Sequence, residues 1–239
     1  MALDAPNAAA NTEDLEFAAP DATRNYRDAL IEEFRPALRG NVLEVGAGIG
    51  QITALLRQLP DISRLLSIEP HAPFAARFRD THPGVEIIEG TVEQTPAGTE
   101  WDAIFSVNVL EHIQADEIEL TRYAKLLSPR RGALCLFVPA RPEIYARIDK
   151  DFGHFRRYTR PELSQKLQSA GFKVEHLTYY NSIGYFAWWL NFCVLKKREF
   201  ELPKVRLFDR HIFPLVHKFE STLLRPPIGQ SLLAIARAT

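Results

Sequence analysis

Short apolar runs alternate with amphipathic segments along the chain. The apolar runs occupy residues 41–45, 64–69, 85–90, 101–107, 132–139, 172–180 and 231–238. The first five are continuously hydrophobic rather than strictly alternating, which is typical of strands buried on both faces. Helical spacing or helix-start signals mark residues 21–38, 50–59, 71–80, 115–127 and 159–171. The pattern therefore predicts seven strands with helices between most of them.

The alternation of strands and helices predicts an α/β fold. Strands joined through helices form a mainly parallel, doubly wound sheet with helices on both faces. About fifty residues, 181–230, separate the last two predicted strands. Connections of that length usually carry structure or function of their own. We expect a single domain over residues 21–239 with a helical insertion at 181–230, and a flexible N-terminal tail at 1–20.

Composition and charge exclude few classes of protein. The 239 residues can bury one substantial core, and 46% apolar with 25% charged residues is ordinary for a globular protein. A net charge of −1 gives no reason to expect nucleic-acid binding. Cys135 and Cys193 stand far apart, which favours a reducing compartment over a disulfide framework. Residues 1–20 contain no apolar leader, and no apolar run reaches about 18 residues, so we expect a cytoplasmic protein.

The stretch VLEVGAGIGQ, residues 42–51, joins a predicted strand to a predicted helix through three glycines. Gly46, Gly48 and Gly50 permit a sharp turn and let a ligand approach bare backbone amides. An acid at the end of the next strand can then accept hydrogen bonds from a ribose diol. Glu69 stands 19 positions after Gly50, close to the spacing of about 20 expected for that role. The stretch therefore predicts a ligand that contains a nucleoside.

Two ligand classes use this geometry. A dinucleotide loop has the spacing G-x-G-x-x-G, but here Gln51 occupies the last position and the spacing is G-x-G-x-G. Glu44 also lies beside the loop, at the end of the first strand. A carboxylate at that place favours a ligand with an ammonium group over a pyrophosphate, because like charges repel. A nicotinamide-dependent oxidoreductase is therefore the weaker interpretation.

Four segments, in this order, resemble motifs of class I S-adenosylmethionine (SAM)-dependent methyltransferases. VLEVGAGIG resembles the first motif, SIEP the acidic second motif, EGTVEQTP the loop around adenine, and WDAIFSVNVLEHI the fourth-strand segment. The resemblance extends over about residues 22–180 and the last strand. It implies a Rossmann-like sheet of seven strands with the last strand antiparallel, and SAM as the cofactor.

The resemblance also implies which residues bind the cofactor. Those in and beside the glycine loop face the methionine portion, and Glu69 holds the ribose hydroxyls. Thr91 and Val92 lie near adenine, although many relatives have Asp in place of Thr91. Tyr26 resembles a lid aromatic, while its helical periodicity equally allows a core position. The expected set is Tyr26, Glu44, Gly46, Ala47, Gly48, Gly50, Glu69, Pro70, Thr91, Val92 and Asn108.

The segment NVLEHI, residues 108–113, raises the question of a metal. In some quinone-biosynthesis O-methyltransferases, a similar segment supplies acids and a histidine to a divalent cation. Glu111 and His112 match that pattern, but Asn108 stands where the first acid would be, and losing a charge weakens a hard-cation site. Metal-free relatives carry LEHI as well. We therefore predict no metal and keep His112 as a candidate catalytic residue.

The segment KDFGHFRRYTRPEL, residues 150–163, is the main candidate for the acceptor side. It resembles a GH-aromatic-RRY stretch in bacterial methyltransferases of the quinone- and polyketide-type small-molecule group. His154 is a residue type suited to a general base, and Arg157 is suited to binding an anionic group. Tyr158 completes the candidate catalytic set. A salt-bridged loop that docks the next helix is an equally open alternative.

The insertion at 181–230 begins with aromatic residues and continues with basic ones. Four of the five residues at 185–189 are aromatic, and residues 196–225 carry a net charge of +4. Such a segment fits a lid over an apolar or anionic acceptor, a peripheral membrane contact through 184–198, or a dimer contact. Packing of Trp188 and Trp189 onto the sheet is the simplest alternative.

Together these observations predict a SAM-dependent methyltransferase. Methyl transfer from a sulfonium requires chiefly that the nucleophile be aligned with the methyl carbon. We expect a small or medium acceptor, apolar or lipid-linked, with oxygen favoured as the methylated atom and carbon or nitrogen left open. The alternatives are a SAM-binding scaffold subunit without activity and, less favoured, the oxidoreductase. Monomer and homodimer are both open, and we expect no nucleic-acid partner.

Overall fold

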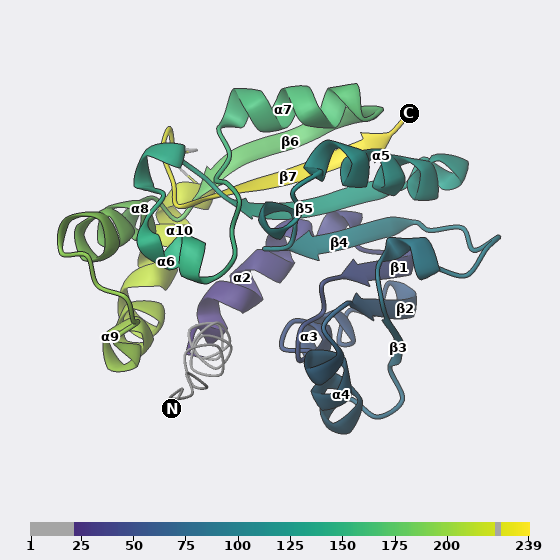
Figure 1. Ribbon diagram of the computed structural model, residues 1–239, viewed down its shortest axis with the longest axis horizontal. Coiled ribbons are helices and arrows are strands. Elements are labelled where there is room, and N and C mark those ends of the chain that lie inside the picture. The colour runs from purple at the N-terminus through teal and green to yellow at the C-terminus, as the bar shows by residue number, and fades with distance from the viewer. Residues whose placement is uncertain (1–21, 223–225) are drawn as a thin grey trace, which may run out of the picture.

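A computed structural model describes residues 22–222 and 226–239, so the tail expected at residues 1–20 lies outside the described residues. A twisted seven-stranded sheet forms the centre of the molecule (Figure 1). The strands are β1 (Gly40–Val45), β2 (Ile62–Glu69), β3 (Glu86–Glu89), β4 (Ala103–Val107), β5 (Ala133–Pro139), β6 (Phe172–Tyr180) and β7 (Ser231–Ala238). Each apolar run of the sequence pattern thus forms one strand.

The strand order is β3-β2-β1-β4-β5-β7-β6. The pairs between β3, β2, β1, β4 and β5 are parallel, whereas β7 runs antiparallel to both of its neighbours. The last strand therefore inserts between β5 and β6 rather than adding to an edge. This arrangement confirms the predicted Rossmann-like fold with an antiparallel last strand.

Helices cover both faces of the sheet. They are α2 (Arg24–Phe34), α3 (Thr53–Leu56), α4 (Ala72–Thr81), α5 (Asp116–Leu127), α6 (Arg147–Asp151) and α7 (Arg160–Ser169). Short 3-10 turns occur at Arg35–Ala37, Val92–Gln94, Leu110–His112, Ser128–Arg130 and Pro142–Ile144. Apolar side chains of α5 and α7 pack on one face, and those of α2 and α3 pack on the other (Figure 1). The core is therefore divided into two layers by the sheet.

Two helices are shorter than predicted. The helix expected at 50–59 has α-helical geometry only at Thr53–Leu56, because the preceding glycine loop occupies residues 46–50 and the residue before Pro60 is disfavoured in a helix. The helix expected at 21–38 changes to a 3-10 turn at Arg35, since Pro36 cannot donate a backbone hydrogen bond. In both cases a glycine or a proline determines where the α-helix begins or ends.

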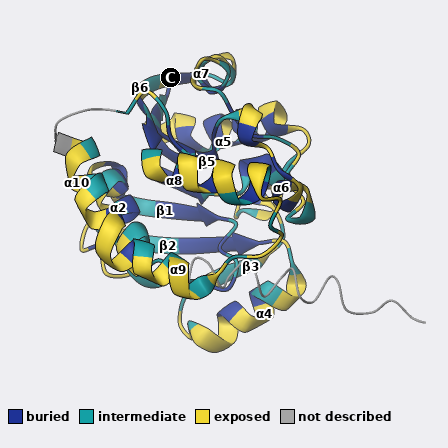
Figure 2. Ribbon diagram, turned by 90° about the vertical axis from the view of Figure 1, so that its left-hand side faces the viewer, coloured by how far each residue is buried: buried dark blue, intermediate teal, exposed yellow. Residues whose placement is uncertain are grey.

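The insertion is helical, as predicted. It contains α8 (Ser182–Trp188), which continues into a π-helical turn at Trp189–Val194. It then contains α9 (Leu202–Leu207), a second π-helical turn at Phe208–Ile212, and α10 (Phe213–Thr222). These helices lie together at one end of the sheet, and Figure 2 views that end face-on. Across residues 22–222 and 226–239, no helix is both long and apolar enough to cross a bilayer.

Candidate active site

A cavity of about 750 Å³ opens at the carboxyl ends of β1, β2, β4 and β5. Its size falls within the range of about 300–1,000 Å³ that is usual for small-molecule sites. The walls come from the glycine loop after β1, the ends of the other three strands, α2, the 150–157 segment and the inner side of the insertion. The cavity therefore brings three of the four predicted cofactor motifs and the predicted acceptor segment into one space.

The glycine loop forms one wall of the cavity. Gly46, Ala47 and Gly48 line it, and both glycines have positive φ angles, +74° and +55°. A Cβ atom on Gly46 would lie 2.2 Å from Cγ2 of Val109. Any side chain at position 46 would therefore combine backbone strain with overlap against the neighbouring loop.

A Gly46→Ala substitution is expected to destabilise the protein by about 3 kcal/mol, because the positive φ costs about 1–2 kcal/mol and overpacking costs a similar amount. Gly84→Ala is the matched control. Gly84 has φ +89° with nothing within 4 Å of its Cβ position, so only the conformational cost of about 1–2 kcal/mol applies. Urea unfolding measures both free energies. Equal losses in the two variants would show that the Val109 contact is unimportant.

Glu44 is buried behind the loop and reaches the cavity. The hydroxyls of Thr53 and Ser67 both donate to its Oε2, each at 2.7 Å. Burial raises the pKa of Glu44 to about 7, and these two hydrogen bonds reduce the rise. A buried carboxyl that is half ionised near neutral pH is well suited to a cationic ligand group, which would favour its ionised form.

Glu69 ends β2 beside the same loop and lines the cavity together with Pro70. Its Oε2 accepts a hydrogen bond from the backbone N–H of Gly48, and its Oε1 accepts one from His71, both at 2.8 Å. Burial raises the pKa of Glu69, while the two backbone bonds lower it. The carboxylate is thus held in place by the backbone of two adjoining loops.

Tyr26 and Asn108 both line the cavity. The Tyr26 ring lines it and also packs against Phe213 and Tyr180, with centroids 4.9 Å and 5.3 Å apart. Tyr26 therefore packs in an aromatic cluster, as a core residue would, and also lines the cavity, as a lid residue would. Asn108 follows β4 with φ +53°, and its backbone N–H donates to the carbonyl of Phe137 at 2.8 Å. Asn108 is exposed and is one of the residues that line the cavity.

Three predicted cofactor residues do not line the cavity. A Cβ atom on Gly50 would lie 2.1 Å from the His82 ring, so Gly50 allows the loop to pack on the end of α4. Val92 is buried in the core, and the hydroxyl of Thr91 donates to the side chain of Gln94. Each of the three thus has a packing or turn-forming position in the structure, and their contact with the cofactor stays a prediction.

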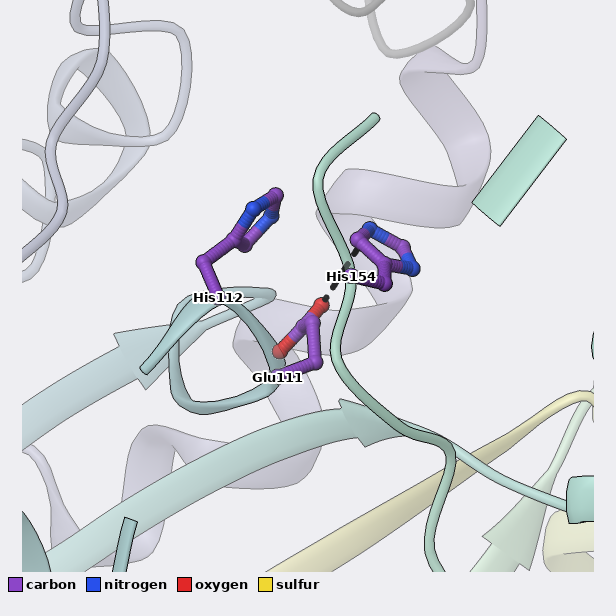
Figure 3. A group of neighbouring side chains, drawn as sticks. All are labelled: Glu111, His112 and His154. Atoms are coloured by element: carbon purple, nitrogen blue, oxygen red, sulfur yellow. Dashed lines mark ion pairs between the residues drawn. The ribbon is translucent and has the colours of Figure 1, made fainter. Parts of the chain in front are cut away.

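His154 projects from the 150–157 segment into the cavity with its side chain 11% exposed. Its Nδ1 lies 3.1 Å from Oδ1 of Asp149, and its Nε2 lies 4.0 Å from Oε1 of Glu111 (Figure 3). The Asp149 contact fixes the ring so that Nε2 is directed away from Asp149. A carboxylate that orients one nitrogen and leaves the other available is the usual arrangement of a histidine base.

Asp149 is fully buried and holds Arg157 as well as His154. Nε and Nη2 of Arg157 each lie 2.8 Å from Oδ1 of Asp149, and the N–H of Ala146 donates to Oδ2 at 2.8 Å. Burial opposes ionisation of Asp149, but the hydrogen bond from His154 and the charge of Arg157 outweigh it and lower the pKa. Asp149 therefore remains a carboxylate at neutral pH.

Arg157 lines the cavity but does not present a free charge to it. Its side chain is 2% exposed, and its guanidinium lies 4.4 Å from the ring centroid of Trp188. Nη1 also donates to the carbonyl of Ala140 at 3.2 Å. The group is thus committed to Asp149 and the aromatic wall, which corrects the expectation of an open clamp for an anion.

Tyr158 lies in the core outside the cavity. Its hydroxyl donates to Oδ2 of Asp116 at 3.0 Å, and Arg156 forms an ion pair with the same carboxylate at 2.7 Å. Burial raises the pKa of Tyr158 far above its ordinary value, so the phenol stays protonated. This position corrects the prediction of a catalytic role. The segment therefore has both of the roles considered for it. Arg156 and Tyr158 bind Asp116 and dock the loop, whereas His154 and Arg157 line the cavity.

Glu111, His112 and His154 form one group whose donor atoms lie within 4.8 Å of one another (Figure 3). Burial and the nearby His154 lower the pKa of His112 to about 4, so its imidazole is neutral at pH 7. Within residues 22–222 and 226–239, this is the group whose donor atoms come close enough to bind a metal ion. One carboxylate with two imidazoles can ligate a transition metal. The prediction that no metal is used therefore needs a direct test.

The sequence reasoning missed Asp149. Asp149 stands one residue before the candidate segment 150–163, and the first acid inside that segment, Asp151, pairs with Arg198 at the surface at 2.9 Å. The spacing of five residues between Asp149 and His154 is no known motif by itself. The signal for Asp149 is local, since the acid completes the first turn of α6 by accepting from Ala146.

The insertion supplies the far wall of the cavity. Trp188, Phe192, Phe200, Val205 and Phe208 line it with apolar surface. The Asp209 carboxylate accepts hydrogen bonds from the backbone N–H groups of Asn25 and Tyr26, at 3.0 and 2.9 Å. Since these N–H groups belong to the first turn of α2, the insertion is tied to the helix that carries Tyr26.

Comparisons with known proteins agree with the observed architecture. The structure superimposes on an S-adenosylmethionine-dependent methyltransferase from Mesorhizobium loti with a TM-score of 0.58 at 15% identity, covering 87% of this chain and 95% of that chain. The DhpI–SAH complex gives 0.55 at 19% identity, covering 95% of both chains. The protein bound to the Trm112 methyltransferase activator of Haloferax volcanii gives 0.57 at 13% identity, covering 92% and 97%. These likenesses establish the fold.

A family model adds to the structural likeness. No curated protein matches the chain at a significant level. The family model described as "Methyltransferase domain" matches residues 18–177, which is well over half of the chain. The matched range contains the glycine loop, Glu44, Glu69 and His154. The chain therefore belongs to the methyltransferase-domain family and has its Rossmann-like class I fold.

Proposed function

We propose that this protein transfers the methyl group of SAM to a hydroxyl oxygen of a small or medium acceptor, apolar or lipid-linked. One observation carries the proposal. A single cavity joins the glycine loop and its two acids to the Asp149–His154 pair beneath an aromatic wall. The first group of residues suits the donor, and the second group suits deprotonation of the acceptor.

The donor half consists of the glycine loop, Glu44 and Glu69. The bare backbone of Gly46 to Gly48 allows close approach of the methionine portion. Glu44 is the carboxyl that would favour the ammonium group, directly or through water. Glu69 is held by two backbone N–H groups and retains lone pairs for the ribose hydroxyls. Tyr26 and Asn108 line the same cavity.

The acceptor half consists of His154 and its partners. SAM supplies an electrophilic methyl carbon on a sulfonium, so an attacking oxygen forms the new O–C bond while the S–C bond breaks and sulfur keeps the electron pair. The hydroxyl proton passes to Nε2 of His154, because Nδ1 is engaged by Asp149. The resulting imidazolium lies between the carboxylates of Asp149 and Glu111, which stabilise its charge. The apolar wall from the insertion suits an apolar acceptor body.

Turnover of methyl-labelled SAM tests the proposal. The full-length protein is incubated with phenolic, carboxylic, amine and polyprenyl acceptors, and label in the acceptor and S-adenosylhomocysteine are both measured. We expect label on oxygen of at least one apolar hydroxyl acceptor. A protein that binds SAM and releases no S-adenosylhomocysteine with any acceptor would instead be a non-catalytic subunit.

SAM binding is expected to strengthen as pH rises through about 7, because the pKa of Glu44 in the free protein is about 7 and only the carboxylate attracts an ammonium group. Below that pKa, Glu44 must lose a proton before it can attract the ammonium group. The dissociation constant for SAM should therefore rise by up to about tenfold for each unit by which the pH falls. Calorimetry between pH 5.5 and 8.5 measures the slope and the proton released. Glu44→Gln should bind weakly at every pH, and an unchanged slope in that variant would place the titrating group elsewhere.

Methyl transfer is expected to persist after treatment with EDTA and dialysis, because we assign the acceptor's proton to His154 rather than to a metal-bound oxygen. The assay compares treated protein with protein supplied with Mg²⁺, Mn²⁺, Zn²⁺ or Fe²⁺. Loss of activity that one metal restores would contradict this prediction. It would assign Glu111, His112 and His154 to a metal centre.

A further inference from the structure

Large exposed apolar side chains gather on the insertion. In the described part of the chain, ten of the thirteen such residues lie between Ile183 and Phe219. They include Trp189 at 46%, Leu207 at 59% and Leu215 at 73% exposure. We name the exposed side of residues 182–222 the cap face. Scattered single apolar residues are normal on a protein surface, but a concentration on one short segment marks an interaction site.

The helices that carry these residues lie at the same end of the molecule. α8, α9 and α10 are grouped together beyond the strand ends in Figure 1. Figure 2 views this end directly and shows exposed turns on all three helices. The cap face is therefore a broad surface at one end of the sheet rather than three unrelated sites.

The cap face is also basic. Residues 182–222 contain seven Lys and Arg against four Asp and Glu, whereas the whole chain has a net charge of −1. Asp209 is buried, Glu201 forms ion pairs with Lys197 and Lys204, and Arg198 pairs with Asp151. The basic character of the exposed surface therefore rests mainly on Lys196, Arg206 and Arg210. Exposed basic and apolar residues alternate closely, as at Lys196 beside Leu195 and Arg206 beside Leu207. Apolar side chains mixed with cations are the composition of segments that lie in a membrane interface.

We propose that the cap face docks on the surface of an anionic lipid bilayer. Its apolar side chains would enter the boundary between headgroups and acyl chains, while its cations contact anionic headgroups. The charge of the cap face favours an anionic bilayer over a second copy of the chain as its binding partner. A two-fold contact would place the basic surface against itself, where like charges repel, whereas an anionic bilayer complements both properties of the face.

The same segment has a second side that lines the cavity. Trp188 is 7% exposed and donates from Nε1 to the carbonyl of Ile144, whereas the next residue, Trp189, is 46% exposed. Docking would therefore hold the cavity wall against the bilayer. The position of the cavity wall next to the docked surface supports a lipid-linked acceptor, and this part of the inference rests on the proposed function. The docking itself does not.

Vesicle sedimentation tests the docking without any acceptor. The full-length protein is mixed with vesicles of phosphatidylcholine alone or of phosphatidylcholine with phosphatidylglycerol. We expect binding to the anionic vesicles, weakened by salt, with a blue shift of tryptophan emission from Trp189. Binding that is equal on both vesicle types, or absent from both, would overturn the proposal.

Two double variants separate the apolar and electrostatic contributions. Leu207→Glu with Leu215→Glu, and Lys196→Glu with Arg206→Glu, are each expected to weaken vesicle binding at least about tenfold. The matched controls are Ile118→Glu, at 56% exposure, and Lys125→Glu, both on α5 and outside the cap face. The controls should bind vesicles like the unmodified protein. A loss equal to that of the cap variants would overturn the proposal.

Two further measurements distinguish failure of the docking proposal from failure of the proposed enzymatic function. SAM affinity, measured on every variant, should be unchanged because no substituted residue lines the donor side of the cavity. Light scattering reports the oligomeric state. A dimer that Leu207→Glu dissociates, together with no vesicle binding, would assign the cap face to a second copy and overturn the docking. Vesicle binding without methyl transfer would leave the docking intact and contradict only the proposed function.

Discussion

Replacing Glu69 with Ala is expected to raise the dissociation constant for SAM at least about a hundredfold. Hydrogen bonds to a charged acceptor contribute about 1.5–3 kcal/mol each, and a ribose diol makes two of them, while 1.4 kcal/mol corresponds to a factor of ten. The substitution also removes the acceptor for the N–H of Gly48, which helps to shape the glycine loop. Calorimetric titration with SAM measures the effect.

Glu89→Ala is the matched control for this variant. Glu89 is the last residue of the neighbouring strand β3 and is exposed. Its carboxylate forms an ion pair with Arg79 at 3.2 Å, and neither residue lines the cavity. We expect wild-type affinity from it, because an exposed ion pair contributes little. Circular dichroism confirms that both variants remain folded. Equal SAM affinity in Glu69→Ala and Glu89→Ala would show that Glu69 does not hold the ribose.

Replacing His154 with Ala is expected to lower kcat by about a hundredfold to ten-thousandfold, which is the usual contribution of a general base. SAM affinity should stay unchanged, because His154 lies on the acceptor side of the cavity with Asp149 and Glu111. Single-turnover measurements with labelled SAM separate the chemical step from binding. The expected signature is therefore a loss of turnover without a loss of cofactor binding.

Two controls distinguish a base from a loop-stabilising residue. His211→Ala removes an exposed histidine of the insertion and should leave turnover unaltered. Asp151→Asn removes the surface acid that pairs with Arg198, two residues from Asp149, and tests whether any disturbance near α6 is harmful. If His154→Ala turns over normally, the segment has only a structural role. If Asp151→Asn loses as much activity as His154→Ala, the loss reflects loop packing.

The sheet and the meeting of the glycine loop with Glu69 at one cavity could be predicted because their signals are local. Apolar runs identify strands, and Gly46 with Gly48 marks a turn that only glycine adopts easily. Glu69 follows from its spacing, since a strand end and its preceding loop are linked by a short crossover. Local reasoning did not reveal the packing of Gly50 against His82, which comes from the end of α4.

The acceptor half could not be predicted in the same way because its partners come from distant segments. His154 meets Glu111 across 43 positions of sequence, and Arg157 meets Trp188 of the insertion. A pattern of residue types reveals neither the burial of Asp149 nor the pairing that takes Arg157 out of use as an anion clamp. Tyr158 shows the converse, because a reactive residue type in a candidate motif is a core residue bound to Asp116.

Titration of the purified protein with S-adenosylhomocysteine, SAM and NAD by calorimetry tests the central claim most directly. We expect one site per chain for both adenosyl ligands, a loss of at least about a hundredfold in Glu69→Ala, and no measurable heat from NAD. Tight binding of NAD with no binding of either adenosyl ligand would contradict the claim and make the protein a nicotinamide-binding member of the same fold.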